Sequence, residues 1–134
     1  DMPKTLEVLE TKGVPVVTVG QDEFPAFWSR KSGLKSPLRL DSPSAIAGFQ
    51  HMREELGIHG GMLIGNPVPE ADEIPGDEMD IYINRALDNA EDDGITGKAV
   101  TPYLLSSIFH LTGGRMQNNA RVASRIAIAL LHRD

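Results

Sequence analysis

The sequence predicts an incomplete α/β fold. It corresponds to part of a three-layer α/β/α domain and forms the C-terminal part of a larger fold. Two short aliphatic runs, VPVVTVG at 14–20 and GGMLIGNPVP at 60–69, are typical of buried parallel strands. Capped segments with helical apolar spacing alternate with these runs. Two strong strands cannot close a sheet, so we expect either a partner chain or a missing N-terminal half to supply more sheet.

The first forty residues alternate between helix and strand. DMPKTLEVLETKG, at 1–13, predicts a short helix with Pro3 in its first turn and Gly13 as its stop. After the strand at 14–20, residues 21–37 predict a long connection that packs some of its own side chains. LRL at 38–40 is a candidate short strand. Connections that follow buried strands are where α/β folds usually hold their sites.

The next helix is predicted after Ser42, a plausible N-cap followed by Pro43, and it ends at Gly57. Its apolar residues recur at spacings of three and four, which predicts one buried stripe. The stripe consists of Ile46, Phe49, Met52 and Leu56.

Three further helices follow the second strand. One is expected from about Asp77 to Asp93, with Met79, Ile83, Ala86, Leu87 and Ala90 facing inward. Another is expected with Thr101 as N-cap and Pro102 as its first residue, and Gly113-Gly114 as its stop. The last is expected to start near Asn118.

Composition excludes several classes of protein. A chain of 134 residues is the size of one domain, and we treat 1–134 as one unit. The net charge of −6, with no Lys/Arg stripe, argues against a nucleic-acid polymer as partner. The longest apolar run, IAIALL at 126–131, is far shorter than a bilayer span, so we expect a soluble protein with no membrane partner. The absence of cysteine excludes disulfides and thiolate chemistry and fits a reducing compartment.

The candidate site residues have competing interpretations. The four histidines lack metal-binding spacing, which favours solvent-facing or capping roles. The carboxylates of 70–80 favour a solvated connection over a cation site. The glycines of GMLIGNP and LTGGR favour tight turns over phosphate binding. In DEFPAFWS, at 22–29, either a carboxyl group lies in an apolar pocket or the loop anchors its aromatic side chains on the core.

DEFPAF at 22–27, NPVP at 66–69 and GKAVTP at 97–102 occur in a single order, and with them the chain resembles the pseudouridine-5'-phosphate glycosidase (pseudouridylate synthase) family. The resemblance extends from Asp1 to about Ala129 and implies the C-terminal portion of the enzyme, a little under half. It implies an α/β/α fold, a homotrimer and a cytoplasmic location, or a mitochondrial one in a eukaryote. The implied reaction is the reversible cleavage of the C–C glycosidic bond of pseudouridine 5'-phosphate, a glycosidase or lyase step of pseudouridine catabolism.

The resemblance also implies where the catalytic groups lie. The family uses a lysine that forms a Schiff base with the opened ribose, a glutamate that transfers a proton, and a divalent metal, typically manganese. All of these are expected upstream of Asp1, so we assign no catalytic or metal-binding residue to this chain. None of its lysines matches the motif: Lys4, Lys12, Lys31, Lys35 and Lys98. The chain alone is therefore expected to be inactive. Alternatives are a noncatalytic fragment that docks onto full-length family subunits, or a fragment that does not fold alone.

The join after Gly113-Gly114 departs from the family pattern. Family members continue with a segment that carries an active-site asparagine, and RMQNNA at 115–120 skips about eight of its residues. Asn118 and Asn119 are the candidate substrate-binding residues, although they match the later asparagine pair that opens the final helix more naturally. We therefore expect a deletion that spares both helices and removes a substrate contact.

Overall fold

The computed structural model describes residues 1–115 and 119–132, and it combines helices with a parallel sheet. The helices are α1 (Met2–Thr11), α2 (Pro43–Glu55), α3 (Gly76–Asp92), α4 (Val100–Leu111) and α5 (Asn119–Leu131), with short 3₁₀ turns at η1 (Glu70–Asp72) and η2 (Gly97–Ala99). The strands are β1 (Val16–Val19), β2 (Glu23–Phe24), β3 (Leu34–Lys35), β4 (Leu38–Leu40) and β5 (Leu63–Gly65). The predicted α/β class is confirmed.

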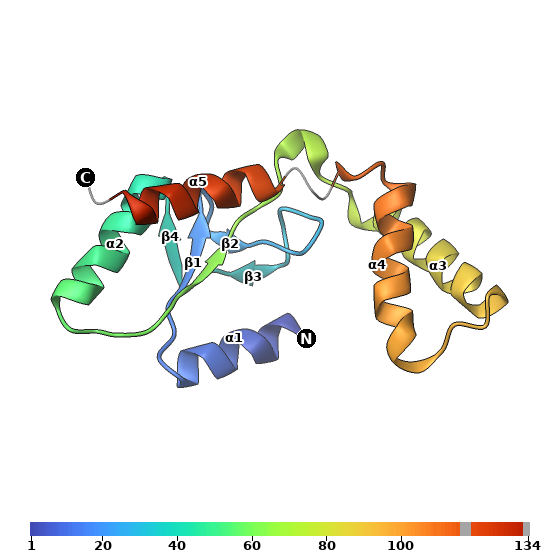
Figure 1. Ribbon diagram of the computed structural model, residues 1–134, viewed down its shortest axis with the longest axis horizontal. Helices are drawn as coiled ribbons and strands as arrows, with labels where there is room; N and C mark the ends of the chain where they lie inside the picture. Colours follow the sequence, from blue (N-terminus) through green and yellow to red (C-terminus); the bar gives the residue numbers. More distant parts are fainter. Residues whose placement is uncertain (116–118, 133–134) are drawn as a thin grey trace.

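The main sheet has three parallel strands in the order β4-β1-β5. In its register, Val17 of β1 lies between Leu38 of β4 and Ile64 of β5. The sheet is layered between helices, with α1 on one side and α2 and α5 on the other (Figure 1). Because side chains alternate along β1, Val17 packs with Ile46 of α2 and Ile126 of α5, whereas its neighbours in β1 point to the α1 side.

A second core lies apart from the sheet, where α3 and α4 pack against each other (Figure 1). Its buried residues include Met79 and Ala86 of α3 and Ile108 of α4. Trp28, from the connection after β1, packs against this core. The backbone N–H of Ile74 donates a hydrogen bond to the carbonyl of Trp28 at 3.1 Å, which ties the two segments together.

Several helix starts and ends predicted from the sequence are confirmed. Ser42 caps α2 by accepting a hydrogen bond from the N–H of Ala45, and Pro43 opens the helix. The helix predicted at 77–93 is α3, displaced by one residue. Gly113 and Gly114 have φ of 63° and 76°, values that favour glycine, and the N–H of Gly114 closes the end of α4 on the carbonyl of Phe109.

The start of α4 and the stripe of α2 were predicted wrongly. Thr101 is not an N-cap, because η2 runs directly into α4 and moves its start to Val100. In α2, Met52 and Leu56 are 61% and 70% exposed. Arg53 takes the buried position instead, where its guanidinium donates to Gln50 Oε1 at 2.9 Å. On α3, Leu87 is also exposed, although it was expected to face inward.

Residues 21–37 contain an antiparallel hairpin that was expected to be an irregular connection. Glu23 pairs with Lys35, and Phe24 with Leu34. Each strand has two residues, too few to show a period in the sequence. We call residues 21–36, which contain both strands, the hairpin segment. Within the described residues, no helix has the length and apolar character needed to cross a membrane.

Candidate functional site

The carboxyl ends of the three parallel strands lie at one edge of the sheet, the usual place for ligand sites in α/β folds. The residues that follow β1 and β4 at this edge are polar, among them Gln21, Asp22 and Asp41. Asn66 follows β5. We call this region, together with the hairpin segment that covers it, the carboxyl-edge site.

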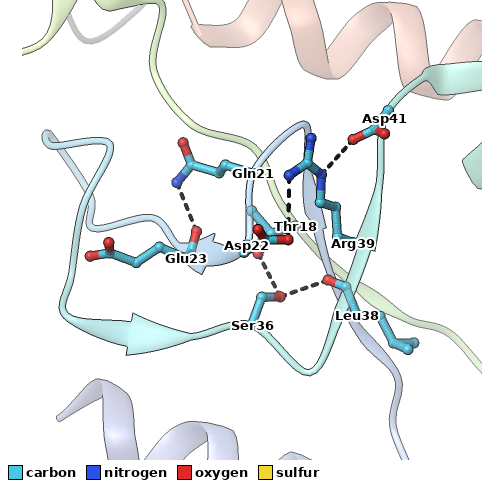
Figure 2. Close-up of polar contacts among 8 residues, drawn as sticks. All are labelled: Thr18, Gln21, Asp22, Glu23, Ser36, Leu38, Arg39 and Asp41. Atoms are coloured by element: carbon cyan, nitrogen blue, oxygen red, sulfur yellow. Dashed lines mark hydrogen bonds and ion pairs between the residues drawn. The ribbon is translucent and has the colours of Figure 1, made fainter.

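Arg39 connects two strand ends at this site. Its Nη1 lies 3.3 Å from Asp22 Oδ1, and its Nε lies 2.6 Å from Asp41 Oδ1 (Figure 2). Hydrogen bonds, first to Asp41 and then to Asp22, raise the pKa of Arg39 above its ordinary value. All three side chains are exposed, so the pairs orient the loops more than they stabilise the fold.

A buried chain of hydroxyl groups lies beneath these ion pairs. Thr18 Oγ1 donates to Ser36 Oγ at 2.8 Å, and Ser36 Oγ donates to the Leu38 carbonyl at 2.7 Å (Figure 2). Thr18 is completely buried in the middle strand. Because buried hydroxyls need partners, this chain fixes the end of the hairpin segment against β1.

Side-chain contacts hold the hairpin segment in shape. Gln21 Nε2 donates to the carbonyls of Glu23 and Arg30 at 2.7 and 2.5 Å. Glu23 Oε1 accepts from the N–H of Gly33 at 2.6 Å, and Ser32 Oγ donates to the Phe24 carbonyl. These bonds satisfy polar backbone groups that the two-residue strands leave unpaired.

Glu73 clamps the hairpin segment onto the connection that follows β5. Its Oε1 accepts from the N–H of Arg30 at 2.9 Å and from Ser29 Oγ at 3.2 Å. Arg30 Nη1 donates in turn to the carbonyl of Val68 at 2.7 Å. We call these contacts the Glu73 clamp.

Gly65, at the end of β5, allows the hairpin segment to approach the sheet closely. A Cβ atom at this position would lie 2.8 Å from Phe24 Cε2 and 3.1 Å from Pro25 Cδ. Packing therefore requires a glycine at position 65 of the GMLIGNP segment. The tight-turn interpretation was wrong here, because Gly65 lies in a strand and is not among the residues with positive φ.

The structure separates the two interpretations of DEFPAFWS. Neither carboxylate lies in an apolar pocket: Asp22 is 79% exposed and pairs with Arg39, and Glu23 binds a backbone N–H. Trp28 packs on the core of α3 and α4, as the anchoring interpretation predicted. Phe27 is exposed and meets Trp28 edge-on.

The other candidate residues are dispersed. Asn118 lies outside the described residues, and Asn119 is the first residue of α5, whose side chain there is not described, so their substrate contact stays a prediction. The histidines lie on α2, before β5, on α4 and after α5: His51, His59, His110 and His132. Within 1–115 and 119–132, no three His, Cys, Asp or Glu side chains could together hold a metal ion. Glu78, in the acidic stretch, accepts from the hydroxyl of Tyr82 and pairs with Arg115.

The family model described as "Indigoidine synthase A like protein" matches residues 1–129. The chain belongs to this family. Curated members of similar sequence are named pseudouridine-5'-phosphate glycosidase. One from Rhizobium johnstonii is 67% identical, over 87% of this chain and 39% of the relative. One from Solibacter usitatus is 57% identical, over 97% of this chain and 46% of the relative.

Two solved structures have a similar fold. A prealnumycin C-glycosynthase in complex with ribulose 5-phosphate has a TM-score of 0.69 and 27% identity, and this chain covers 44% of it. An indigoidine synthase A-like protein from Thermotoga maritima has a TM-score of 0.66 and 34% identity, with the same coverage. The chain thus spans less than half of the relatives it matches, and it is a partial α/β domain, as expected.

The alignments also bear on the short join after Gly114. The alignment with the Solibacter protein has 138 positions. It includes 97% of this chain, which is about 130 of the 134 residues. About eight positions therefore have no counterpart in this chain, which agrees in number with the expected deletion. Its place between Gly114 and Asn118 stays a prediction, because residues 116–118 lie outside the described part.

None of the contacts that build the carboxyl-edge site was predicted from the sequence. Thr18 did carry a signal, since it is the polar residue within the apolar run VVTV. Glu73 and Arg30 carried none, because they are 43 residues apart and meet only in the folded chain.

Proposed function

We propose that this chain is the C-terminal portion of a pseudouridine-5'-phosphate glycosidase. The reaction would be the reversible cleavage of the C–C glycosidic bond, a lyase-type step that yields uracil and ribose 5-phosphate. The observation that carries the proposal is the 67% identity to the Rhizobium protein of that name, over 87% of this chain. The solved relative that holds ribulose 5-phosphate supports a pentose phosphate as part of the substrate.

In this proposal, the carboxyl-edge site shapes the substrate pocket and the remainder of the family fold supplies the reactive groups. The residues at the strand ends are held by Arg39 and by the Glu73 clamp, which gives the pocket a rigid wall. The described residues do not fit a divalent metal, because they contain no cluster of three suitable ligands. We therefore assign the metal, typically manganese, to the remainder of the family fold, and we assign no metal-dependent step to this chain.

The proposal extends to the whole protein. A homotrimer in the cytoplasm, with pseudouridine 5'-phosphate as its small-molecule substrate, follows from the family resemblance. Asn118 and Asn119 remain the proposed substrate contacts of this chain. The alternative, a noncatalytic fragment that docks onto family subunits, is favoured by one feature: no side chain of α1 is buried in the chain alone.

The test measures uracil release from pseudouridine 5'-phosphate with Mn²⁺ present. The 134-residue chain alone should release none, and it should release uracil when it is co-expressed with the remainder of the Rhizobium homologue, the part this chain does not match. The matched control pairs that remainder with the homologue's own corresponding segment. Uracil release by the chain alone would refute our placement of the catalytic groups. An active control beside an inactive pairing with this chain would favour the noncatalytic alternative.

A further inference from the structure

Helix α1 is held unusually weakly for an amphipathic helix. It has ten residues, none of them buried, and Val8 is 53% exposed. Isolated helices of this length are marginal in water, and most helices in proteins are stabilised by burying an apolar face. Helix α1 therefore lacks the partner surface that its sequence pattern requires.

A groove beside α1 continues this uncovered surface. Its volume is about 570 Å³, and it is lined mainly by Leu6 and Glu10 of α1, Val14, Val16, Leu38 of β4 and Phe49 of α2. Leu38 is 42% exposed although it lies in a strand. The lining residues of the groove come from both α1 and α2. These two helices lie on opposite sides of the sheet (Figure 1). We call this surface the α1 groove.

The groove lies beside a sheet edge without a neighbouring strand. Strand β4 pairs only with β1 among the described residues, so its outer backbone groups have no ladder partner there. All-parallel sheets are normally covered on both faces, and open edges invite further strands. An aliphatic strand or helix is the chemistry that this surface fits.

The coverage of the two solved structures indicates which part of the fold this surface would take. Nearly the whole chain, 97% and 98%, superposes on the two solved relatives, yet it accounts for only 44% of each. The other 56% of their fold must therefore pack outside the surface formed by this chain's own elements. A large, uncovered apolar groove beside an open strand is the natural contact for such a segment.

We propose that the α1 groove is the docking surface for the remainder of the family fold. This inference rests on the family membership and does not require the proposed glycosidase activity. Docking would bury Leu6 and Leu38, and it would reach Lys35 and Ser36 of the hairpin segment, which also line the groove.

The test measures binding without substrate. A tagged form of the 134-residue chain is co-expressed with the remainder of the Rhizobium homologue, and the amount that co-purifies is quantified. Leu6→Asp and Leu38→Asp place a charge in the groove at side chains that are not fully buried, so they should spare the chain and reduce co-purification by about tenfold or more. The matched control is Ile81→Asp, at an exposed apolar position on α3, which should leave binding unchanged.

Each other outcome overturns the proposal. Equal loss from the groove and control variants, or no loss from either groove variant, would place the interface elsewhere. No co-purification with this chain, whether or not the homologue's own segment binds, would mean that the groove does not take the remainder. A homodimer that Leu38→Asp abolishes would assign the groove to a second copy of the chain. Binding without uracil release would support the docking surface and count only against the proposed activity.

Discussion

Gly65 shows how one residue sets the distance between the hairpin segment and the sheet. Its missing Cβ leaves room for the ring of Phe24, which would otherwise be 2.8 Å away. We predict that Gly65→Ala lowers the free energy of unfolding by about 1–3 kcal/mol, because the ring must move out of a packed position. The measurement is urea unfolding followed by circular dichroism.

Gly48→Ala is the matched control for this change. Gly48 lies within α2, and a Cβ atom there would meet nothing within 4 Å. Since alanine is the better helix former, Gly48→Ala should raise stability by about 0.5–1 kcal/mol. Equal stability of the two variants would show that Phe24 yields without cost.

Both tyrosines of the chain donate to carboxylates. The hydroxyl of Tyr103 donates to Asp93 Oδ2 at 2.6 Å, and that of Tyr82 donates to Glu78 Oε1 at 3.0 Å. These hydrogen bonds are the main reason why the pKa of each tyrosine is raised above its ordinary value. Each protonated hydroxyl is therefore favoured in the folded state.

The pH dependence follows from this direction. The contribution of Tyr103 to stability should be complete below about pH 10, the ordinary pKa of tyrosine, and should be lost as pH rises through the higher pKa of the folded state. Absorbance at 295 nm in a Tyr82→Phe background isolates Tyr103. Adding Asp93→Asn should lower the pKa of Tyr103, and an unchanged titration would contradict the role of Asp93.

Among the structural elements, the hairpin segment depends most on a single distant residue. Glu73 accepts two hydrogen bonds from it, one of them from the backbone N–H of Arg30. We predict that Glu73→Ala speeds hydrogen exchange at the Arg30 amide by about tenfold or more, since hydrogen bonds to charged groups contribute about 1.5–3 kcal/mol. Mass spectrometry of peptides from 24–33 would measure it.

The neighbouring Glu70 offers the control, because it is exposed on the same connection. Glu70→Ala should leave exchange in the hairpin segment unchanged. Similar exchange in the two variants would mean that the backbone bond between Ile74 and Trp28, together with Arg30 and Val68, suffices to hold the segment.

The elements that could be predicted from sequence are those determined by their own residues. Ser42 and Pro43 start α2 through local hydrogen bonding and fixed φ, and Gly113 and Gly114 end α4 through positive φ. The two aliphatic runs became β1 and β5, because a short apolar stretch is enough to indicate a strand of a parallel sheet. Strand β1 is buried as expected, whereas Leu63 of β5 is 37% exposed.

The failures occurred where distant contacts decide the outcome. Arg53 replaces Met52 at a buried position of α2 because its guanidinium finds acceptors, Gln50 Oε1 and the carbonyl of Gly60. The candidate site is a more extreme case. Its clamp joins Arg30 to Glu73, and nothing in either local sequence indicates the pairing.

At the scale of the whole molecule, the described residues form two cores. Val17, Ile46 and Ile126 form one between the sheet, α2 and α5, and the other joins α3 to α4 around Met79. The described backbone between them consists of connections, and Trp28 is an aromatic anchor from the sheet side that reaches the second core (Figure 1). With so few apolar side chains shared, the two cores need not unfold together.

We predict that the isolated chain unfolds in two steps. Trp28, the single tryptophan, reports on the second core, whereas far-ultraviolet circular dichroism reports on all helices. Met79→Ala should lower the urea midpoint seen by fluorescence, and Ile46→Ala should lower the midpoint seen by circular dichroism with little effect on fluorescence, because each removes buried apolar volume worth about 2–5 kcal/mol from one core only. Coincident midpoints in both variants would show instead that the contacts of Trp28 and the Glu73 clamp couple the cores into one cooperative unit.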